Sequence, residues 1–189
     1  MEPEPFIQTI SGRRVNPFAL TSADIDICDI AQALANQCRF GGHCRRFYSV
    51  AQHSCLVADL VGAQGGDKTA RLWALLHDAP EAYLSDLPHP MKHFGEFGRL
   101  YREAEDRLQS VISEHFGLPR EPSRALRDAD RALLAAERLT LMADAWEWPE
   151  LRGVQPADIE IDPWPPEQAA SEFLSRYRML RDGRARERL

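Results

Sequence analysis

With 189 residues and a formal net charge of −6, the chain is long enough for one well-packed domain and too acidic for a broad nucleic-acid surface. Apolar residues make up 44% and charged residues 28%, a balance typical of soluble globular proteins. No apolar run reaches the length of a membrane span, and the acidic, proline-rich start MEPEPF is unlike a signal or transit peptide, so we expect no membrane partner and a cytoplasmic location.

The four cysteines contain no Cys-x-x-Cys pair; they are Cys28, Cys38, Cys44 and Cys55. A chain of this size needs no disulfide framework, so free thiols in a reducing compartment are expected. A zinc site could be drawn from Cys38, Cys44 and Cys55 with His43 and His53, but this spacing matches no standard zinc pattern.

Apolar spacing predicts helices along most of the chain. A short hairpin or an extended arm is expected from Phe6 to Phe18, around a Ser-Gly turn. Thr21 or Ser22 is expected to cap a first helix that ends near Cys38. Further helices are expected from Ser49 to Gly62, from Asp67 or Lys68 to Asp78, from Phe97 to Phe116, and from Ser123 to Leu141.

These elements predict a single all-α domain over residues 1–189, with a core of about residues 22–145. A Trp- and Pro-rich segment, 146–166, is expected to cross the surface as an ordered loop, and a C-terminal helix to cover 167–182. In the helix from Phe97 to Phe116, the stripe expected to face the core is Phe97, Leu100, Ala104, Leu108, Val111 and Ile112.

An acid-free stretch runs from Ile30 to Ala58 and carries three arginines, Arg39, Arg45 and Arg46. In an acidic protein such a stretch suits a small anion such as a phosphate, although a solvated arginine face explains it equally well. The pair Gly41-Gly42 within it predicts a loop whose backbone can approach another group closely.

Three separate helices each place polar groups on or beside an apolar face. His53 falls on the face of the helix that Ser49 opens, the pair His77-Asp78 ends the next, and Asp130 lies between Leu126 and Leu133 on a third. Taken singly, His53 is a satisfied core histidine and Asp130 half of a buried ion pair. Taken together, they can form one His, His, Asp, Asp site, which suits Mn, Co, Fe, Ni or Zn, with Mg as a further candidate.

The stretch HDAPEAYLSDLPHPMK, from His77 to Lys92, is more specific than the bare His-Asp pair. With His53 and Asp130 it resembles the HD-domain metal-dependent phosphohydrolases, and in particular bacterial 5′-deoxynucleotidases and small deoxynucleoside triphosphate triphosphohydrolases. The similarity covers most of the chain, roughly residues 30–141. It implies the compact multi-helix HD-domain fold, with His53, His77, Asp78 and Asp130 as the ligands of a divalent metal ion.

The same resemblance implies catalytic roles for two acids. Glu81 matches the glutamate that activates or positions the attacking water, and Asp86 matches a second acid that orients water or protonates the leaving oxygen. Helix capping, or an ion pair with an arginine in the case of Glu81, remains the alternative for each. Pro80 removes a backbone donor, so the helix either kinks at Ala79 or stops and restarts, and this decides where Glu81 points.

Cations are expected where negative charge develops on phosphoryl oxygens, and the candidates are Arg39, Arg45, Arg46 and Lys92. The pair Arg39-Phe40 resembles the Arg-aromatic pair that precedes the first histidine in the deoxynucleotidases. This likeness implies that Arg39 meets phosphate and that Phe40 stacks on a base. The alternatives that Lys92 is merely solvated and that Phe40 belongs to the core remain open. His89 and His93 are expected to be exposed in a Pro-flanked turn.

The resulting expectation is a phosphohydrolase that acts on a small nucleotide, a deoxynucleoside 5′-monophosphate or triphosphate, and that binds no nucleic acid stably. Alternatives are an HD-type phosphodiesterase or alarmone hydrolase, or a non-catalytic, metal-stabilised nucleotide-binding protein. The phosphodiesterase that hydrolyses cyclic diguanylate has a companion GYP motif, which this sequence lacks. Exposed amphipathic helices are compatible with a homodimer or a higher homo-oligomer.

Overall fold

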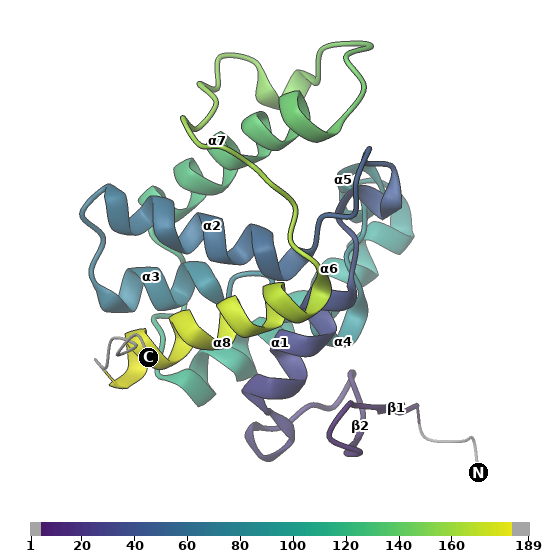
Figure 1. The fold of residues 1–189 in the computed structure, drawn as a ribbon. Helices are drawn as coiled ribbons and strands as arrows, with labels where there is room; N and C mark the ends of the chain where they lie inside the picture. Colours follow the sequence, from purple (N-terminus) through teal and green to yellow (C-terminus); the bar gives the residue numbers. More distant parts are fainter. Residues whose placement is uncertain (1–4, 183–189) are drawn as a thin grey trace.

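The computed structural model describes residues 5–182, and its architecture in that range is mainly helical, as the apolar spacing predicts. Figure 1 shows the arrangement of the helices. The elements in chain order are β1 (Ile7–Gln8), β2 (Arg14–Val15), the 3-10 helix η1 (Ser22–Asp24), α1 (Ile27–Asn36), the 3-10 helix η2 (Arg39–Gly42), α2 (Val50–Ala63), α3 (Lys68–Leu75), α4 (Glu81–Leu84), α5 (His89–His93), α6 (Gly95–Phe116), α7 (Arg124–Leu141), the 3-10 helix η3 (Pro149–Leu151) and α8 (Pro166–Asp182). None of the described helices combines the length and the apolar character that crossing a bilayer requires.

The N-terminal arm is a short antiparallel hairpin in which Ile7 pairs with Val15 and Gln8 with Arg14. It is fastened to α1 by Asp29, whose carboxylate accepts hydrogen bonds from the backbone N–H and the hydroxyl of Ser11 at 2.9 and 2.7 Å. Of the two forms predicted for this segment, the hairpin is the one present.

The first long helix begins later than the sequence predicts. Asp24 accepts a hydrogen bond from the backbone N–H of Thr21 at 2.8 Å, and this closes the short turn η1. Ile25 then adopts an extended conformation, and Asp26 caps α1 by accepting from the backbone N–H of Cys28 at 2.8 Å. Two successive caps therefore separate η1 from α1, where one continuous helix was expected.

Helix α2 is the central element of the fold (Figure 1). It packs against α1, α3, α7 and α8, and every residue from Val50 to Ala58 is buried. Fully buried side chains of the surrounding helices include Leu34, Leu75, Leu133 and Phe173, each of which contributes about 1.5–3 kcal/mol through burial. A polar group on α2 therefore has to find its partners inside the protein.

The chain between α3 and α4 stops being a regular helix and then restarts. Helix α3 ends at Leu75, residues 76–80 form turns, and α4 starts at Glu81 with Pro80 in helical conformation at its cap. The backbone N–H of Glu81 still donates to the carbonyl of Asp78 at 3.0 Å. Pro80 thus interrupts the helix while keeping the chain compact enough to leave Glu81 near Asp78.

The predicted core stripe of α6 is wrong at its first two positions. Phe97 is 59% and Leu100 51% exposed, and the buried face instead runs through Gly98, Tyr101, Ala104 and Leu108 to Phe116. The first turns of α6 pack mainly against the short helix α5. At Gly98 a Cβ atom would lie 2.6 Å from the carbonyl oxygen of Lys92, so the absence of a side chain is what allows this close approach.

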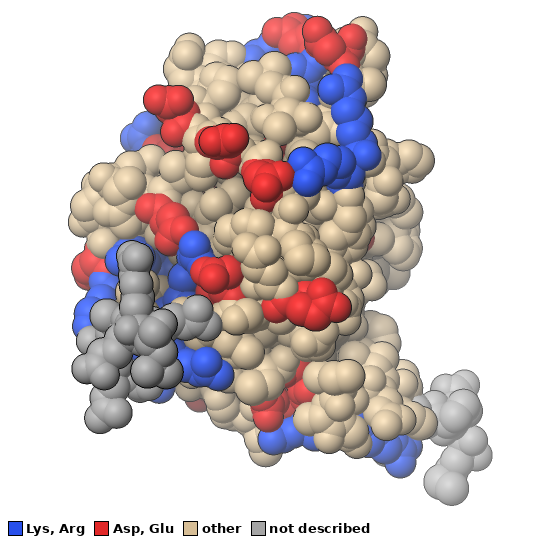
Figure 2. Space-filling model, in the orientation of Figure 1, with Lys and Arg blue, Asp and Glu red and all other residues tan. Residues whose placement is uncertain are grey.

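The segment after α7 crosses over α2 before α8 begins, as Figure 1 shows in the transition from green to yellow. The amide of Gln52 on α2 holds it at two points, donating to the carbonyl of Asp162 at 2.8 Å and accepting from the backbone N–H of Trp164 at 2.8 Å. Figure 2 shows acidic and basic side chains interspersed on the face in view, without a continuous basic surface there.

Candidate metal centre and cavity

Four polar side chains from three separate segments converge near the N-terminal end of α2. His53 Nε2 lies 3.1 Å from an Asp130 oxygen and 3.7 Å from an Asp78 oxygen. His77 Nε2 lies 3.3 Å from the other Asp78 oxygen and 3.9 Å from Asp130. The ligand atoms of His53, His77 and Asp130 all lie within 4.8 Å of one another, the spacing that a bound metal ion requires.

Both imidazole rings are oriented by hydrogen bonds from their other nitrogen. Nδ1 of His77 lies 2.7 Å from the carbonyl oxygen of Ala74, and Nδ1 of His53 lies 2.7 Å from an oxygen of Glu137. Since both acceptors are oxygens, Nδ1 donates in each ring, and Nε2 is the nitrogen that faces the cluster and can bind a metal ion once it is deprotonated. This is how metal-binding histidines are commonly held.

Glu137 also belongs to this network, although it was not predicted as a site residue. It is fully buried on α7, and it accepts hydrogen bonds from the hydroxyl of Tyr48 at 2.7 Å and from Arg39 at 3.1 Å. Burial alone would raise the pKa of Glu137, but the charges of Arg39 and His53 bring it below its ordinary value. Its position on the buried stripe, seven residues after Asp130, was the available signal, because a buried carboxylate has to be paired.

The electrostatics of the cluster suit a divalent cation. Burial and the charge of Arg39 oppose protonation of His53, yet Glu137 and Asp130 raise its pKa to about 10 in the protein without metal. Burial likewise opposes ionisation of Asp130, and its contact with His53 nevertheless holds its pKa below the ordinary range. Two imidazole nitrogens and two ionised carboxylates form a nitrogen–oxygen ligand set that fits Mn, Fe, Co, Ni or Zn.

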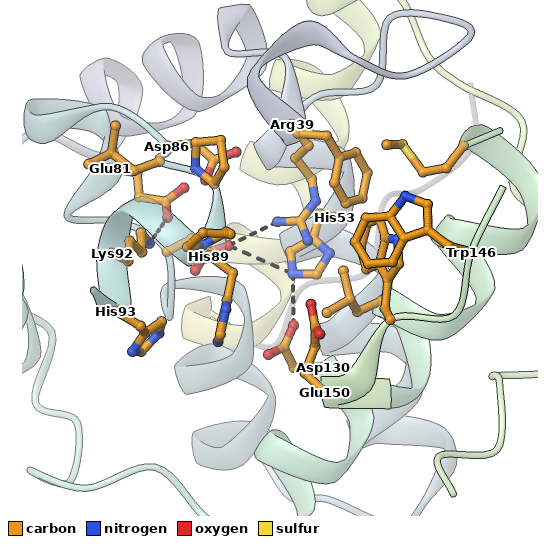
Figure 3. Close-up of a pocket in the computed structure, with 18 residues that line it drawn as sticks. Arg39, His53, Glu81, Asp86, His89, Lys92, His93, Asp130, Trp146 and Glu150 are labelled. Carbon is orange, nitrogen blue, oxygen red and sulfur yellow. Dashed lines mark hydrogen bonds and ion pairs between the residues drawn. The ribbon is translucent and has the colours of Figure 1, made fainter. Parts of the chain in front are cut away.

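Three members of the cluster, His53, Asp78 and Asp130, line a cavity of about 410 Å³, drawn in Figure 3, and His77 lies behind them without lining it. Glu81, Asp86, His89, Lys92 and His93 come from one wall, and Trp146 stands on the opposite wall, with Arg39 and His53 between them (Figure 3). The remaining lining residues are Phe40, Asp78, Leu87, Pro88, Pro90, Asp130, Leu134, Met142, Trp148 and Glu150. The two segments HDAPEAYLSDLPHPMK and Arg39-Phe40 thus face one space.

Glu81 lines this cavity and is almost completely buried, and one of its oxygens lies 2.5 Å from Nζ of Lys92. The other oxygen, Oε2, has no hydrogen-bond partner within residues 5–182. Burial and the charge of Asp78 raise the pKa of Glu81 well above its ordinary value, against the opposing effect of Lys92.

Lys92 is held between two carboxylates, because it also donates to Glu105 at 2.8 Å. Burial would lower its pKa, but Glu81 and Glu105 raise it above the ordinary value, so the ammonium stays charged. Asp86 also lines the cavity, and its backbone N–H donates to Gln37 at 2.9 Å. Burial raises the pKa of Asp86 although Arg39 opposes the shift.

Of the three arginines in the acid-free stretch, the structure brings only Arg39 to the cavity. Its guanidinium contacts Glu137 and lies 3.6 Å from Asp78, while Nε has no partner within the described residues. Arg45 is exposed and lines no part of the cavity, and Arg46 forms a surface ion pair with Asp162 at 2.9 Å.

The wall opposite Glu81 is aromatic. The ring of Phe40 contacts Trp148 edge-on with 6.0 Å between centroids, and Trp148 lies 6.2 Å from Trp146. Trp146 lines the cavity and is 65% exposed. His89 and His93 also line the cavity, and both are exposed, as predicted. The two tryptophans and Glu150 were not predicted as site residues, and the Trp-rich composition of segment 146–166 was the only signal for them.

Comparison with known proteins finds two relatives along nearly the full length. The chain is 38% identical over 177 residues to a protein of Escherichia coli strain K12 described as uncharacterized protein YfdR, covering 93% of this chain and 95% of the relative. It is 36% identical over 185 residues to the uncharacterized protein RCAP_rcc00048 of Rhodobacter capsulatus, covering 90% of this chain and 93% of the relative. No family model matches the chain.

Proposed function

The chain belongs to the family of YfdR and RCAP_rcc00048, and we propose that it is a metal-dependent phosphohydrolase of the HD superfamily that acts on a small nucleotide. Its substrate class is a deoxynucleoside 5′-monophosphate or triphosphate. Water cleaves the bond between the 5′ oxygen and phosphorus, and the products are the nucleoside and phosphate or triphosphate.

One observation carries the proposal: His53, His77, Asp78 and Asp130 converge so that both Nε2 atoms lie within 4 Å of the same two carboxylates, beside a cavity that also holds a buried glutamate. Metal sites that serve only for structure are closed to solvent and need no neighbouring base. Here Asp130 is about one-third exposed to the cavity, so a ligand from solvent or substrate can enter. A divalent ion at this position would supply Lewis-acid polarisation of the phosphoryl group.

Glu81 is the group best placed to take a proton from the attacking water. It has an oxygen free of hydrogen bonds to described residues, and it lines the same cavity as Asp78 and Asp130. Burial and Asp78 raise its pKa well above the ordinary value, which makes the carboxylate a stronger proton acceptor. Lys92 fixes the second oxygen of the carboxylate and limits this shift.

Two further features suit a nucleotide. Arg39 borders the cavity with a charged, partly unsatisfied guanidinium, and a guanidinium binds phosphate oxygens well. The aromatic wall of Phe40, Trp146 and Trp148 offers ring faces for a base, which a phosphate-only substrate would not need. Asp86 lies on the opposite wall with a raised pKa, which suits donation of a proton to the leaving 5′ oxygen.

The test is hydrolysis of a panel of deoxynucleoside monophosphates and triphosphates by the purified protein with Mn²⁺ or Co²⁺. We expect release of phosphate or of triphosphate, with the product identifying the substrate class. Glu81→Gln should bind the metal and lose turnover, whereas the exposed Glu114→Gln should leave turnover unchanged. If no member of the panel releases phosphate or triphosphate, the proposed activity is excluded.

A further inference from the structure

Two thiols lie in contact at the two ends of the loop that presents Arg39 and Phe40. Sγ of Cys38 is 3.5 Å from Sγ of Cys44, and no disulfide joins them. Both residues are partly accessible, whereas Cys28 is exposed elsewhere and Cys55 is buried. A small oxidant can therefore reach this pair, and the remaining two cysteines provide internal controls.

The loop between the two thiols is tightly constrained. Phe40 adopts a left-handed backbone with φ of 59°, followed by Gly41 at 60° and Gly42 at 81°. At its start the backbone N–H of Arg39 donates to the carbonyl of Tyr48 at 2.9 Å, and near its end that of Arg45 donates to Leu141 at 2.9 Å. The two sulfurs are held close by this backbone and do not meet by chance motion of a flexible segment.

We infer that Cys38 and Cys44 form a reversible disulfide with a low-molecular-weight disulfide as the oxidant, and that this bond regulates substrate binding by displacing Arg39. The regulatory half rests on the proposed function, because it assigns Arg39 to the phosphate. The modification itself rests only on the two sulfur atoms and their accessibility.

The exchange is balanced with oxidised glutathione as the reactant. One thiolate of the pair attacks a glutathione sulfur, the glutathione disulfide breaks, and the first glutathione leaves as a thiolate that takes up a proton. The second cysteine, as its thiolate, attacks the protein sulfur of the mixed disulfide, which forms the Cys38–Cys44 bond and expels the second glutathione. Two protein thiols are oxidised, and one glutathione disulfide is reduced to two thiols.

The pKa of the attacking thiol predicts how the rate of the exchange depends on pH. Burial and the hydrogen bond to Cys38 raise the pKa of Cys44 to about 11, so its thiolate is scarce at neutral pH. The thiolate is the reactive species, and the exchange should therefore accelerate steadily as the pH rises toward that value.

The bond changes the position of Arg39 because a disulfide requires about 2.05 Å between sulfurs, well below the present 3.5 Å. Closing this gap moves the backbone next to Arg39, whose guanidinium is held 3.1 Å from Glu137 and 3.6 Å from Asp78. Hydrogen bonds to a substrate oxygen weaken when a donor leaves the range of about 2.7–3.2 Å. The oxidised protein is therefore expected to bind nucleotide less tightly.

Peptide mapping after treatment of the full chain with oxidised glutathione tests the modification. Trypsin cleaves after Arg14, Arg39 and Arg45, so the predicted bond links peptide 15–39 to peptide 40–45. Because peptide 15–39 also carries Cys28, the mapping uses Cys28→Ser, in which the link should persist, with Cys44→Ser as the matched variant that abolishes it. Glutathione adducts without a linked peptide, or no reaction at all, would overturn the inference.

Calorimetric titration of a deoxynucleoside monophosphate into reduced and oxidised Cys28→Ser protein tests the consequence. We expect the affinity to fall about tenfold on oxidation, because the charge-assisted hydrogen bond from Arg39 to the phosphate is weakened. Dithiothreitol should restore it, and Cys44→Ser should not respond to oxidant. Unchanged affinity in fully linked protein would overturn the regulatory role. If reduced protein binds no nucleotide, the proposed function fails, while the mapping still decides the disulfide.

Discussion

Glu137 Oε1 lies 2.7 Å from Nδ1 of His53, and this contact connects the buried interior of α7 to the candidate metal centre. The same carboxylate accepts hydrogen bonds from Tyr48 and Arg39, so one fully buried group orients both the ring of a candidate metal ligand and a cation at the cavity. An uncompensated carboxylate would be costly at this depth, and its three donors compensate it.

Glu137→Gln should weaken metal binding while the fold persists. The amide oxygen can still accept from Nδ1, but the negative charge that favours the donating tautomer is lost, and changes of this kind lower metal affinity by about 10- to 100-fold. Competitive titration with a chelating dye measures the affinity. Asp128→Asn, an exposed change on the same helix, is the control and should bind metal as the wild type does. Equal affinities would contradict the role given to Glu137.

Lys92→Met should move the acid limb of the pH–rate profile to higher pH. Lys92 lowers the pKa of Glu81, against burial and Asp78, which raise it. Without the ammonium, the pKa of Glu81 rises further, so the ionised base is present only at higher pH and turnover falls on the acid side of the profile. The profile of kcat/KM from pH 5 to 9 measures this shift. Lys68→Met, at the start of α3, is the control, and an unmoved acid limb in Lys92→Met would argue against Glu81 as the base.

Arg39→Lys should raise KM roughly tenfold or more, because a charge-assisted hydrogen bond is worth about 1.5–3 kcal/mol and the lysine ammonium lacks the planar fork. Arg45→Lys is the matched control, since Arg45 lies in the same stretch without lining the cavity. Initial-rate kinetics on a single nucleotide give both values. Should Arg45→Lys and Arg39→Lys raise KM equally, the phosphate contact would not be specific to Arg39.

Trp146→Ala should separate base recognition from phosphate chemistry. Stacking on an aromatic ring is worth about 1–3 kcal/mol per base, so KM for a nucleotide should rise about fivefold or more. Hydrolysis of glycerol phosphate, which has no ring, should be unaffected. Because Trp146 is exposed, the free energy of unfolding should change little. If hydrolysis of both substrates declined in parallel, the aromatic wall would not be a base site.

The sequence predicts the helices and the grouping of the candidate metal ligands because both depend on local spacing. The stripe through Leu126, Asp130 and Leu133 has helical periodicity whatever packs against it, and the structure has α7 there. His53, His77, Asp78 and Asp130 can be grouped because each is an ionisable residue at or beside an apolar face. The convergence of these four side chains is the part of the site that the sequence anticipated most fully.

Other features depend on contacts that spacing does not encode. Phe97 and Leu100 fit a core stripe, yet the first turns of α6 pack mainly against the short helix α5, and these two side chains stay exposed. Arg45 and Arg39 look alike in sequence. The path of the loop between Cys38 and Cys44, whose thiols are in contact, places Arg39 at the cavity and leaves Arg45 outside it. Trp146 reaches the site through a segment without regular structure, whose path has no periodic signal.

The most direct test of the account is hydrolysis of a deoxynucleoside 5′-monophosphate by chelator-stripped protein during stepwise return of Mn²⁺, with bound metal measured in parallel. We predict that the stripped protein is inactive, that turnover rises in proportion to bound Mn²⁺ and reaches its plateau at about one ion per chain, and that Asp130→Asn needs far more metal for the same rate. Full activity in the stripped protein, or one bound Mn²⁺ per chain without any phosphate release from a substrate panel, would contradict the account.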